Sequence, residues 1–116
     1  MTVQRKDFTI ANGATESDFV RVPGARLVGL ILPTLTSTTV TFETASDGAT
    51  TDGVVNSNTP GAAPAALTLG NANVGAIVQA VPEAVGALSA VIPIRLKVAA
   101  QGAARTVTGL FERVAS

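Results

Sequence analysis

The strongest constraint on the fold is an alternation of polar and apolar residues at period two, which is typical of a half-buried β-strand. It is clearest in Thr39–Glu43 and in Ile92–Val98. Pro93 has no backbone N–H, so we expect it at the start or at the edge of its strand. The inward-facing residues that these two runs predict are Val40, Phe42, Ile94, Leu96 and Val98.

Six further runs have the character of strands. Arg26–Leu32 is apolar from Leu27 onward and predicts a central strand that is buried on both faces. Arg105–Val114 is a long run of β-forming residues. Because Leu110 and Phe111 break its alternation, we expect a bulge near Gly109. The weaker runs are Gln4–Ile10, Asp18–Val22, Leu67–Leu69 and Ala76–Val81.

Turn signals separate these runs and indicate how they connect. Asn12-Gly13 and Pro23-Gly24 favour tight turns, and Gln101-Gly102 predicts a hairpin between the last two strands. One segment, Pro82–Leu88, could form one or two helical turns across an end of the fold. About eight short strands with such spacing predict an all-β fold. We expect a single-domain antiparallel β-sandwich, jelly-roll-like, over residues 1–116, with at most one short helix.

The segment 44–66 differs from the rest, because almost every residue in it is small, polar or turn-forming. Loops of this length are uncommon in a compact domain and are usually functional or disordered. We expect an arm that is ordered mainly by neighbouring subunits, with a plain disordered insertion as the alternative, and Val54-Val55 could form a short strand within it. The candidate protein-interface residues are Asp47, Asp52, Val54, Val55, Asn56, Asn58, Pro60 and Pro64.

The residue types that most enzymes use are missing. The chain has no His and no Cys, which removes most metal ligands and most nucleophile–base pairs. A hydrolase with two carboxylates would need a cleft, and a polysaccharide cleft normally presents aromatic platforms. Asp47 and Asp52 could offer oxygen ligands to calcium, but their spacing fits two Asp-Gly turns better than a calcium loop. We therefore expect no enzymatic activity, no cofactor, no metal site and no small-molecule substrate.

Charge and aromatic content exclude further classes of partner. The eight basic and eight acidic residues cancel, so the net charge gives no general attraction to nucleic acid or to an acidic membrane surface.

The longest apolar run, Leu27–Leu32, is far shorter than a membrane helix, and the first residues do not resemble a signal peptide. The four Phe residues, Phe8, Phe19, Phe42 and Phe111, lie where core residues are expected.

A low content of charge points to assembly. Charged residues make up 14% of the chain, where about 25% is average for soluble domains. A surface of small uncharged residues is often covered by neighbouring subunits. The absence of Cys favours production in a reducing cytoplasm or stabilisation by oligomerisation.

The order of these segments resembles a loose group of small β-sandwich proteins from the structural gene regions of tailed phages. The segments that carry the resemblance are Phe8–Thr15, Arg26–Pro33, Val40–Gly48, Ile94–Gln101 and Arg105–Leu110. Members of the group look like decoration or cement proteins on the outside of the capsid. The resemblance implies a non-enzymatic structural protein of the virion, made in the host cytoplasm and located at the capsid surface. Its implied partners are the major capsid protein and itself, as a homotrimer.

A tail or baseplate module that binds host-surface glycan is the alternative from another functional class. The same sandwich could serve it, because a fold does not determine function. The scarcity of aromatic residues counts against this alternative, since sugar sites rely on aromatic stacking.

Overall fold

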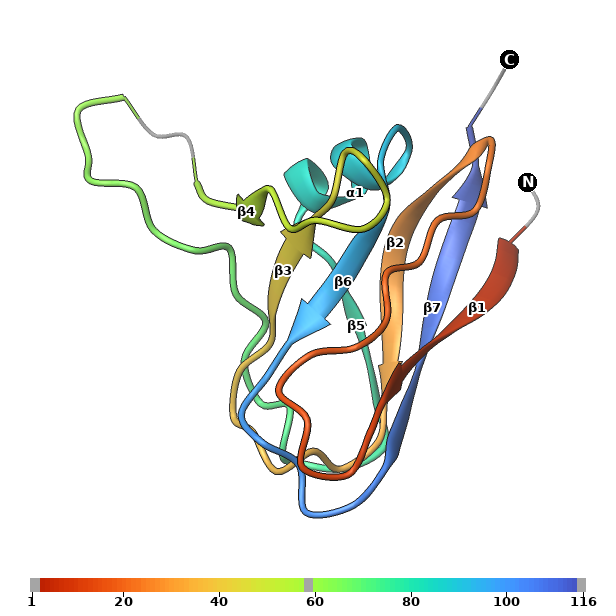
Figure 1. The fold of residues 1–116 in the computed structure, drawn as a ribbon, viewed down its shortest axis with the longest axis vertical. Coiled ribbons are helices and arrows are strands. Elements are labelled where there is room, and N and C mark those ends of the chain that lie inside the picture. The colour runs from red at the N-terminus through yellow and green to blue at the C-terminus, as the bar shows by residue number, and fades with distance from the viewer. Residues whose placement is uncertain (1–2, 58–59, 115–116) are drawn as a thin grey trace.

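The computed structural model describes residues 3–57 and 60–114, which form two antiparallel sheets packed face to face (Figure 1). One sheet has four strands in the order β1-β7-β2-β5, and the other has three in the order β4-β3-β6. The elements are β1 (Val3–Ile10), β2 (Ala25–Leu32), β3 (Thr41–Thr44), β4 (Gly53–Val54), β5 (Ile77–Ala80), α1 (Glu83–Ser89), β6 (Ile94–Lys97) and β7 (Arg105–Arg113). The predicted all-β sandwich with one short helix is confirmed.

The described residues contain seven strands, where about eight were predicted. Asp18–Val22 and Leu67–Leu69 are not regular strands. Each makes only an isolated bridge, Val20 to Ile94 and Leu69 to Val40. The short strand expected at Val54-Val55 is present one residue earlier, as β4.

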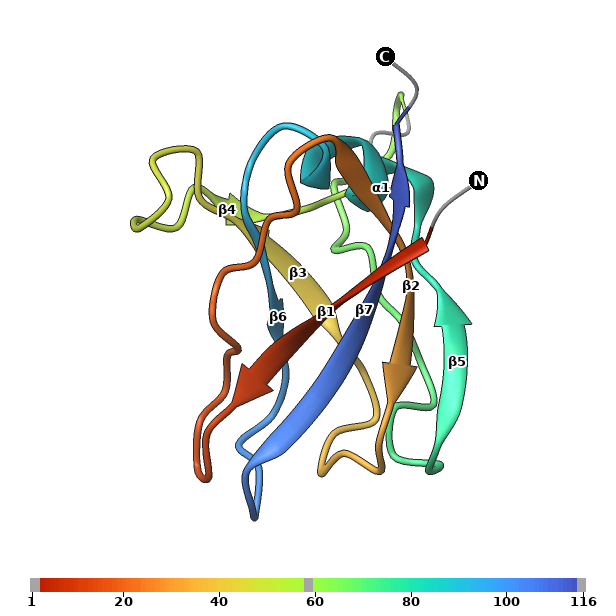
Figure 2. The same cartoon turned by 90° about the vertical axis from the view of Figure 1, so that its right-hand side faces the viewer.

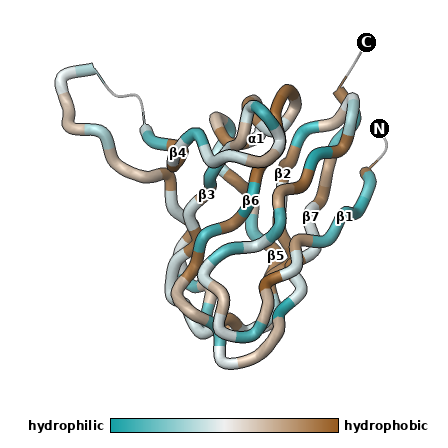
Figure 3. The backbone as a smooth tube through the Cα atoms, viewed as in Figure 1, coloured by the Kyte–Doolittle hydropathy of each residue, from teal (hydrophilic) through white to brown (hydrophobic). Residues whose placement is uncertain are grey.

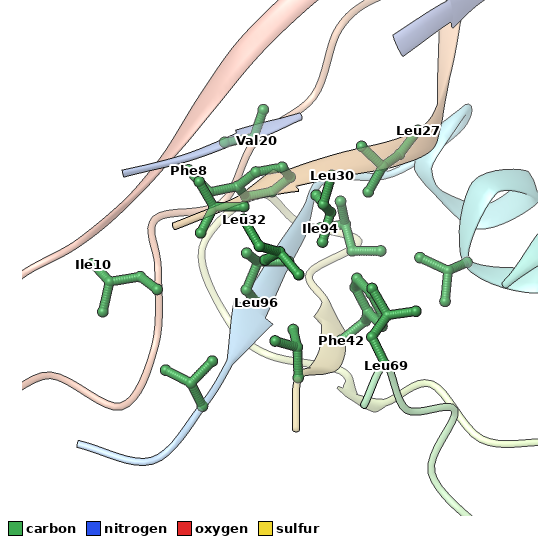
Figure 4. Packing of buried hydrophobic residues seen from close by; sticks show 14 of the residues in the cluster. Phe8, Ile10, Val20, Leu27, Leu30, Leu32, Phe42, Leu69, Ile94 and Leu96 are labelled. Carbon is green, nitrogen blue, oxygen red and sulfur yellow. The ribbon is translucent and has the colours of Figure 1, made fainter. Parts of the chain in front are cut away.

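The core lies between the sheets, and the five residues predicted to face inward are all buried there. Phe42 and Ile94 approach from the three-stranded sheet, and Phe8 and Leu30 approach from the opposite side (Figure 4). The rings of Phe8 and Phe111 stack with their centroids 6.4 Å apart. The expectation that every Phe is a core residue is wrong for one of them. Phe19 is only half-buried, because it lies outside the sandwich against the guanidinium group of Arg95.

A bulge is present near Gly109, opposite Leu110 and Phe111, but the extra residue belongs to the partner strand β2 and not to β7. Leu27 pairs with Phe111 and Gly29 pairs with Leu110, so Val28 is the extra residue. The extra residue reverses the phase of β2, which brings Leu30 and Leu32 into the core. The alternation of β7 is unbroken, because Gly109 takes the inward position beside Leu110.

The predicted hairpin at Gln101-Gly102 is wrong, because β6 and β7 belong to different sheets. The connection crosses from the three-stranded sheet to the four-stranded sheet at one end of the sandwich (Figure 2). Gln101 is buried and holds this crossing in place. Its side-chain oxygen accepts from the Thr36 N–H at 2.8 Å, and its backbone carbonyl accepts from the Gly13 N–H at 2.7 Å.

Helix α1 closes the other end of the sandwich, where it packs against β2 (Figure 1). The Leu27 N–H donates to the buried Ser89 Oγ at 2.7 Å, and Val85 enters the core. The helix was predicted to within one residue at each end, with Pro82 immediately before its first residue. No helix among residues 3–57 and 60–114 is long and apolar enough to cross a bilayer.

Candidate protein interface

The structure divides the predicted arm into a closed turn and a projecting part. Residues 45–52 fold back on the sandwich, where the Ala45 N–H donates to the Pro93 carbonyl at 3.2 Å. Residues 53–57 and 60–66 are called the outer arm below. The arm begins with β4 at the edge of the three-stranded sheet, and its further part, residues 60–66, projects beyond the sandwich (Figure 1). The two parts therefore differ in what they can offer to a partner.

Backbone hydrogen bonds anchor the base of the outer arm to β3. The Val55 N–H donates to the Phe42 carbonyl at 2.8 Å, and the Leu67 N–H donates to the Val55 carbonyl at 3.0 Å. One step further out, the Ser57 N–H donates to the Ala65 carbonyl at 2.7 Å. The base is thus ordered by the chain itself.

The side chains of the outer arm are mostly free of contacts with the domain. Residues 60–66, which include the candidates Pro60 and Pro64, are all exposed. Val54 and Asn56 are exposed at the base, where Asn56 bridges to Ala66. The candidate Asn58 lies outside the described residues.

The prediction that Val55 is an interface residue is wrong. It is buried in the core of the domain with only 7% of its surface exposed, so it cannot line a free surface in this conformation. The reason is its position in the ladder: Val54 pairs with Glu43 on β3, so the next residue along the strand turns inward.

The candidates Asp47 and Asp52 act as turn-stabilising acceptors. The N–H groups of Ala49 and Thr50 donate to Asp47 Oδ1 at 2.8 and 2.6 Å, and they hold the pKa of this carboxyl below its usual range. Asp52 accepts from the Ser46 N–H at 2.7 Å and from the Ser46 hydroxyl at 2.8 Å. Within the described part of the chain, no group of three acidic side chains gathers in a way that could hold a metal ion.

A charged cluster on the outer face of the three-stranded sheet was not predicted. Arg95 Nε donates to Glu43 Oε1 at 2.8 Å, and Arg95 also pairs with Glu16 and donates to the Thr51 hydroxyl at 2.7 Å. Its guanidinium carbon lies 4.5 Å from the centroid of the Phe19 ring. The cluster fastens the closed turn and the segment around Phe19 to the sheet.

The only sequence signal for this cluster was the alternation, which places Glu43 and Arg95 on the outer faces of their strands. Their pairing could not be inferred, because it needs the β3–β6 register across 52 residues of chain.

An uncharged stretch of the chain runs from the outer arm to β5. From Gly53 to Pro82 the sequence contains no Asp, Glu, Lys or Arg. The structure keeps this stretch together, because the Gln79 side chain on β5 donates to the Gly70 carbonyl at 2.7 Å. By contrast, the first half of β1 is markedly hydrophilic (Figure 3). The stretch from the outer arm to β5 therefore contributes no charge to the surface of the protein.

The aromatic residues offer little surface for stacking, and all four lie in the described part of the chain. Phe8, Phe42 and Phe111 have no exposed surface, and the Phe19 ring is covered on one face by Arg95. An open hollow floored by hydroxyl groups lies beside the loop 36–39, next to Lys97 and Val98. It could accept polar groups but has no ring against which a sugar could stack.

Comparison of the chain with protein-family models, with curated proteins and with solved structures found no match. The residues and their arrangement are therefore the basis for proposing a function.

Proposed function

We propose that the protein is a non-enzymatic structural protein of a phage virion, which decorates and stabilises the capsid by bridging shell subunits. The observation that carries the proposal is the outer arm. It is anchored at its base by the domain's own hydrogen bonds, yet residues 60–66 are exposed. A segment of small uncharged side chains projecting from a rigid sandwich is suited to lie against another protein.

The energetics of such a role fit the composition. Ordering a free segment costs roughly 1–2 kcal/mol per residue, and Pro60 and Pro64 lower that cost because they restrict the unbound chain. Contacts of modest strength, repeated over many copies on a shell, give tight binding through multivalency. Neither effect needs a deep pocket.

The proposed partners are the major capsid protein and further copies of this chain, as a homotrimer. The proposed location is the outer surface of the capsid, after synthesis in the host cytoplasm. No cofactor and no catalytic residue take part in this function. The scarcity of exposed aromatic rings favours this role over a glycan-binding tail module, since Phe8, Phe42 and Phe111 are buried and Phe19 is half-buried beneath Arg95.

Co-sedimentation with genome-free shells of the phage that encodes the chain tests this proposal. We expect the wild-type protein to sediment with the shells. A variant in which Asn-Gly replaces residues 57–65 keeps the Asn56–Ala66 pair at a hairpin turn, so it should fold. We expect that variant to bind the shells more weakly.

The control for this experiment carries serine at the exposed positions Ala103 and Ala104, in the crossing loop. It should bind as the wild type does. Failure of the wild-type protein to bind would overturn the proposed function. Equal binding by the shortened and wild-type proteins would exclude the outer arm as the contact.

A further inference from the structure

The two edges of the four-stranded sheet are protected very differently. Edge strand β1 carries Arg5, Lys6 and Asp7, and its end is closed by a hydrogen bond from the Thr9 N–H to Asp18 Oδ1 at 2.8 Å. Edge strand β5 carries no charge. Because natural proteins protect exposed edges with charges or cover them, β5 has the character of an edge that a partner covers.

An apolar strip continues from this edge across the outer face of the same sheet. In the strand register, Val78 lies opposite Ile31, and Leu110 lies opposite Gly29, next to the bulged Val28. Val78 is 66% exposed, and the other three side chains are half-buried on the face away from the core. The side chains of Val28, Ile31, Val78 and Leu110 are called the outer strip below.

Charge restricts what can cover the outer strip. Charged residues border the strip at one end, where Arg5 lies opposite Leu110 and Arg26 pairs with Glu112. At the other end, around Val78 and Ile31, the cross-strand neighbours are uncharged. A charged side chain placed there would lose its hydration without gaining a counter-ion, which is costly. The partner surface must therefore be uncharged and rich in small or apolar groups. The outer arm meets that requirement, since it contains Val54, Pro60, Pro64 and several Ala residues and no charged residue.

The geometry of one molecule keeps these two surfaces apart. The outer arm extends beyond β4 (Figure 1), whereas β5 forms a different side of the sandwich (Figure 2). The arm is held at its base on β3, in the other sheet, and so it is directed away from its own strip. A contact between arm and strip therefore has to join two copies.

We infer that the outer arm of one copy packs on the outer strip and β5 edge of the next copy. The contact is heterologous, because it joins two different surfaces, and a heterologous contact closes into a ring when its rotation allows. This inference rests on the proposed self-association as a trimer and identifies the surfaces that form it. It assigns to β5 and Val78 a role that the sequence did not indicate.

Two lysine substitutions test the inference, with the oligomeric state measured by light scattering. Val78→Lys places a charge in the contact, and we expect self-association to weaken at least about tenfold. The matched control is Val3→Lys, which changes a valine that is 53% exposed on the opposite edge strand. It should assemble as the wild type does. At a concentration at which the wild type is monomeric, both melting temperatures should stay near the wild-type value, since both side chains face solvent in one copy.

Cross-linking identifies the pair of surfaces, because the wild-type chain has no Cys. With a short bifunctional maleimide, we expect Ala63→Cys protein to cross-link to Val78→Cys protein when the two are mixed. Self-linking of Val78→Cys protein alone would instead show β5 against β5 and overturn the inference. So would a Val78→Lys protein that remains as oligomeric as Val3→Lys.

The outcomes separate this inference from the proposed function. A wild-type protein that is monomeric at every concentration but sediments with shells would overturn the arm–strip contact and leave the decoration role standing. A trimer that depends on Val78 but never binds shells would overturn the decoration role and leave the arm–strip contact standing.

Discussion

Phe42 illustrates at the residue scale how the two sheets are held together. Its side chain has no exposed surface and lies among Leu30, Leu69 and Ile94 (Figure 4). The hydrophobic contribution of such a ring is lost when it is truncated, and the cavity left behind adds to the cost.

We predict that Phe42→Ala lowers the free energy of unfolding by about 3–5 kcal/mol, measured by chemical denaturation. The matched control is Phe19→Ala. That ring is half-buried outside the core, and its contact with Arg95 is worth about 0.5–1 kcal/mol at an exposed site. Equal losses for the two variants would mean that the core is not centred between the sheets.

Single residues also show what could be inferred from the sequence. Val40 and Leu96 were placed correctly, because the phase of a strand is a local property. The partners of Arg95 were not inferred, since Glu43, Glu16 and Thr51 come from three separate segments. Such a cluster depends on the register between strands, which the alternation does not specify.

Among the elements, α1 depends on a very close approach to β2. A Cβ added at Gly86 would lie 2.7 Å from the carbonyl oxygen of Leu27, which is a backbone atom and cannot move aside. The helix is also held by the hydrogen bond from Leu27 to Ser89. The sequence predicted the helix but not this contact.

We predict that Gly86→Ala destabilises the protein by about 1–3 kcal/mol, although alanine is the better helix former by about 1 kcal/mol. Thermal unfolding measures the effect. The comparison is Ala87→Gly at an exposed position of the same helix, where only helix propensity is lost. A Gly86→Ala protein that is more stable than the wild type would contradict the close packing.

The connections between elements were the least predictable part of the fold. Gln101-Gly102 has the residues of a tight turn, yet β6 pairs with β3, and β7 lies between β1 and β2. A turn signal marks where the chain reverses but not which sheet the next strand joins. The bulge was inferred from β7, where Leu110 and Phe111 are adjacent, but it is Val28 on the partner strand that is inserted.

The arm was recognised from its composition, and the structure divides it further. Its length and lack of bulky residues distinguished 44–66 from the strands. The role of Val55 in the core depends on the pairing of β4 with β3, which only the folded chain defines. Of the two predicted Asp-Gly turns, Asp47-Gly48 is confirmed, because Asp47 accepts from the N–H groups of Ala49 and Thr50. Asp52-Gly53 is not a turn, because Gly53 begins β4 and Asp52 accepts from Ser46 instead.

At the scale of the whole molecule, the surface is divided by charge. Arg95, Lys97, Glu16 and Glu43 gather on the outer face of the three-stranded sheet, and Arg5, Lys6 and Asp7 lie on β1. The stretch from Gly53 to Pro82, which includes the outer arm and β5, contains none. Surface charge keeps a monomeric protein soluble. A long uncharged stretch is therefore more consistent with a protein that functions within an assembly.

Cryo-electron microscopy of shells with and without the added protein tests the central claim most directly. We predict extra density on the outer surface where shell subunits meet, with a volume equal to three copies of an 11.6 kDa chain at each site. Identical reconstructions with and without the protein, or density confined to the tail, would contradict it.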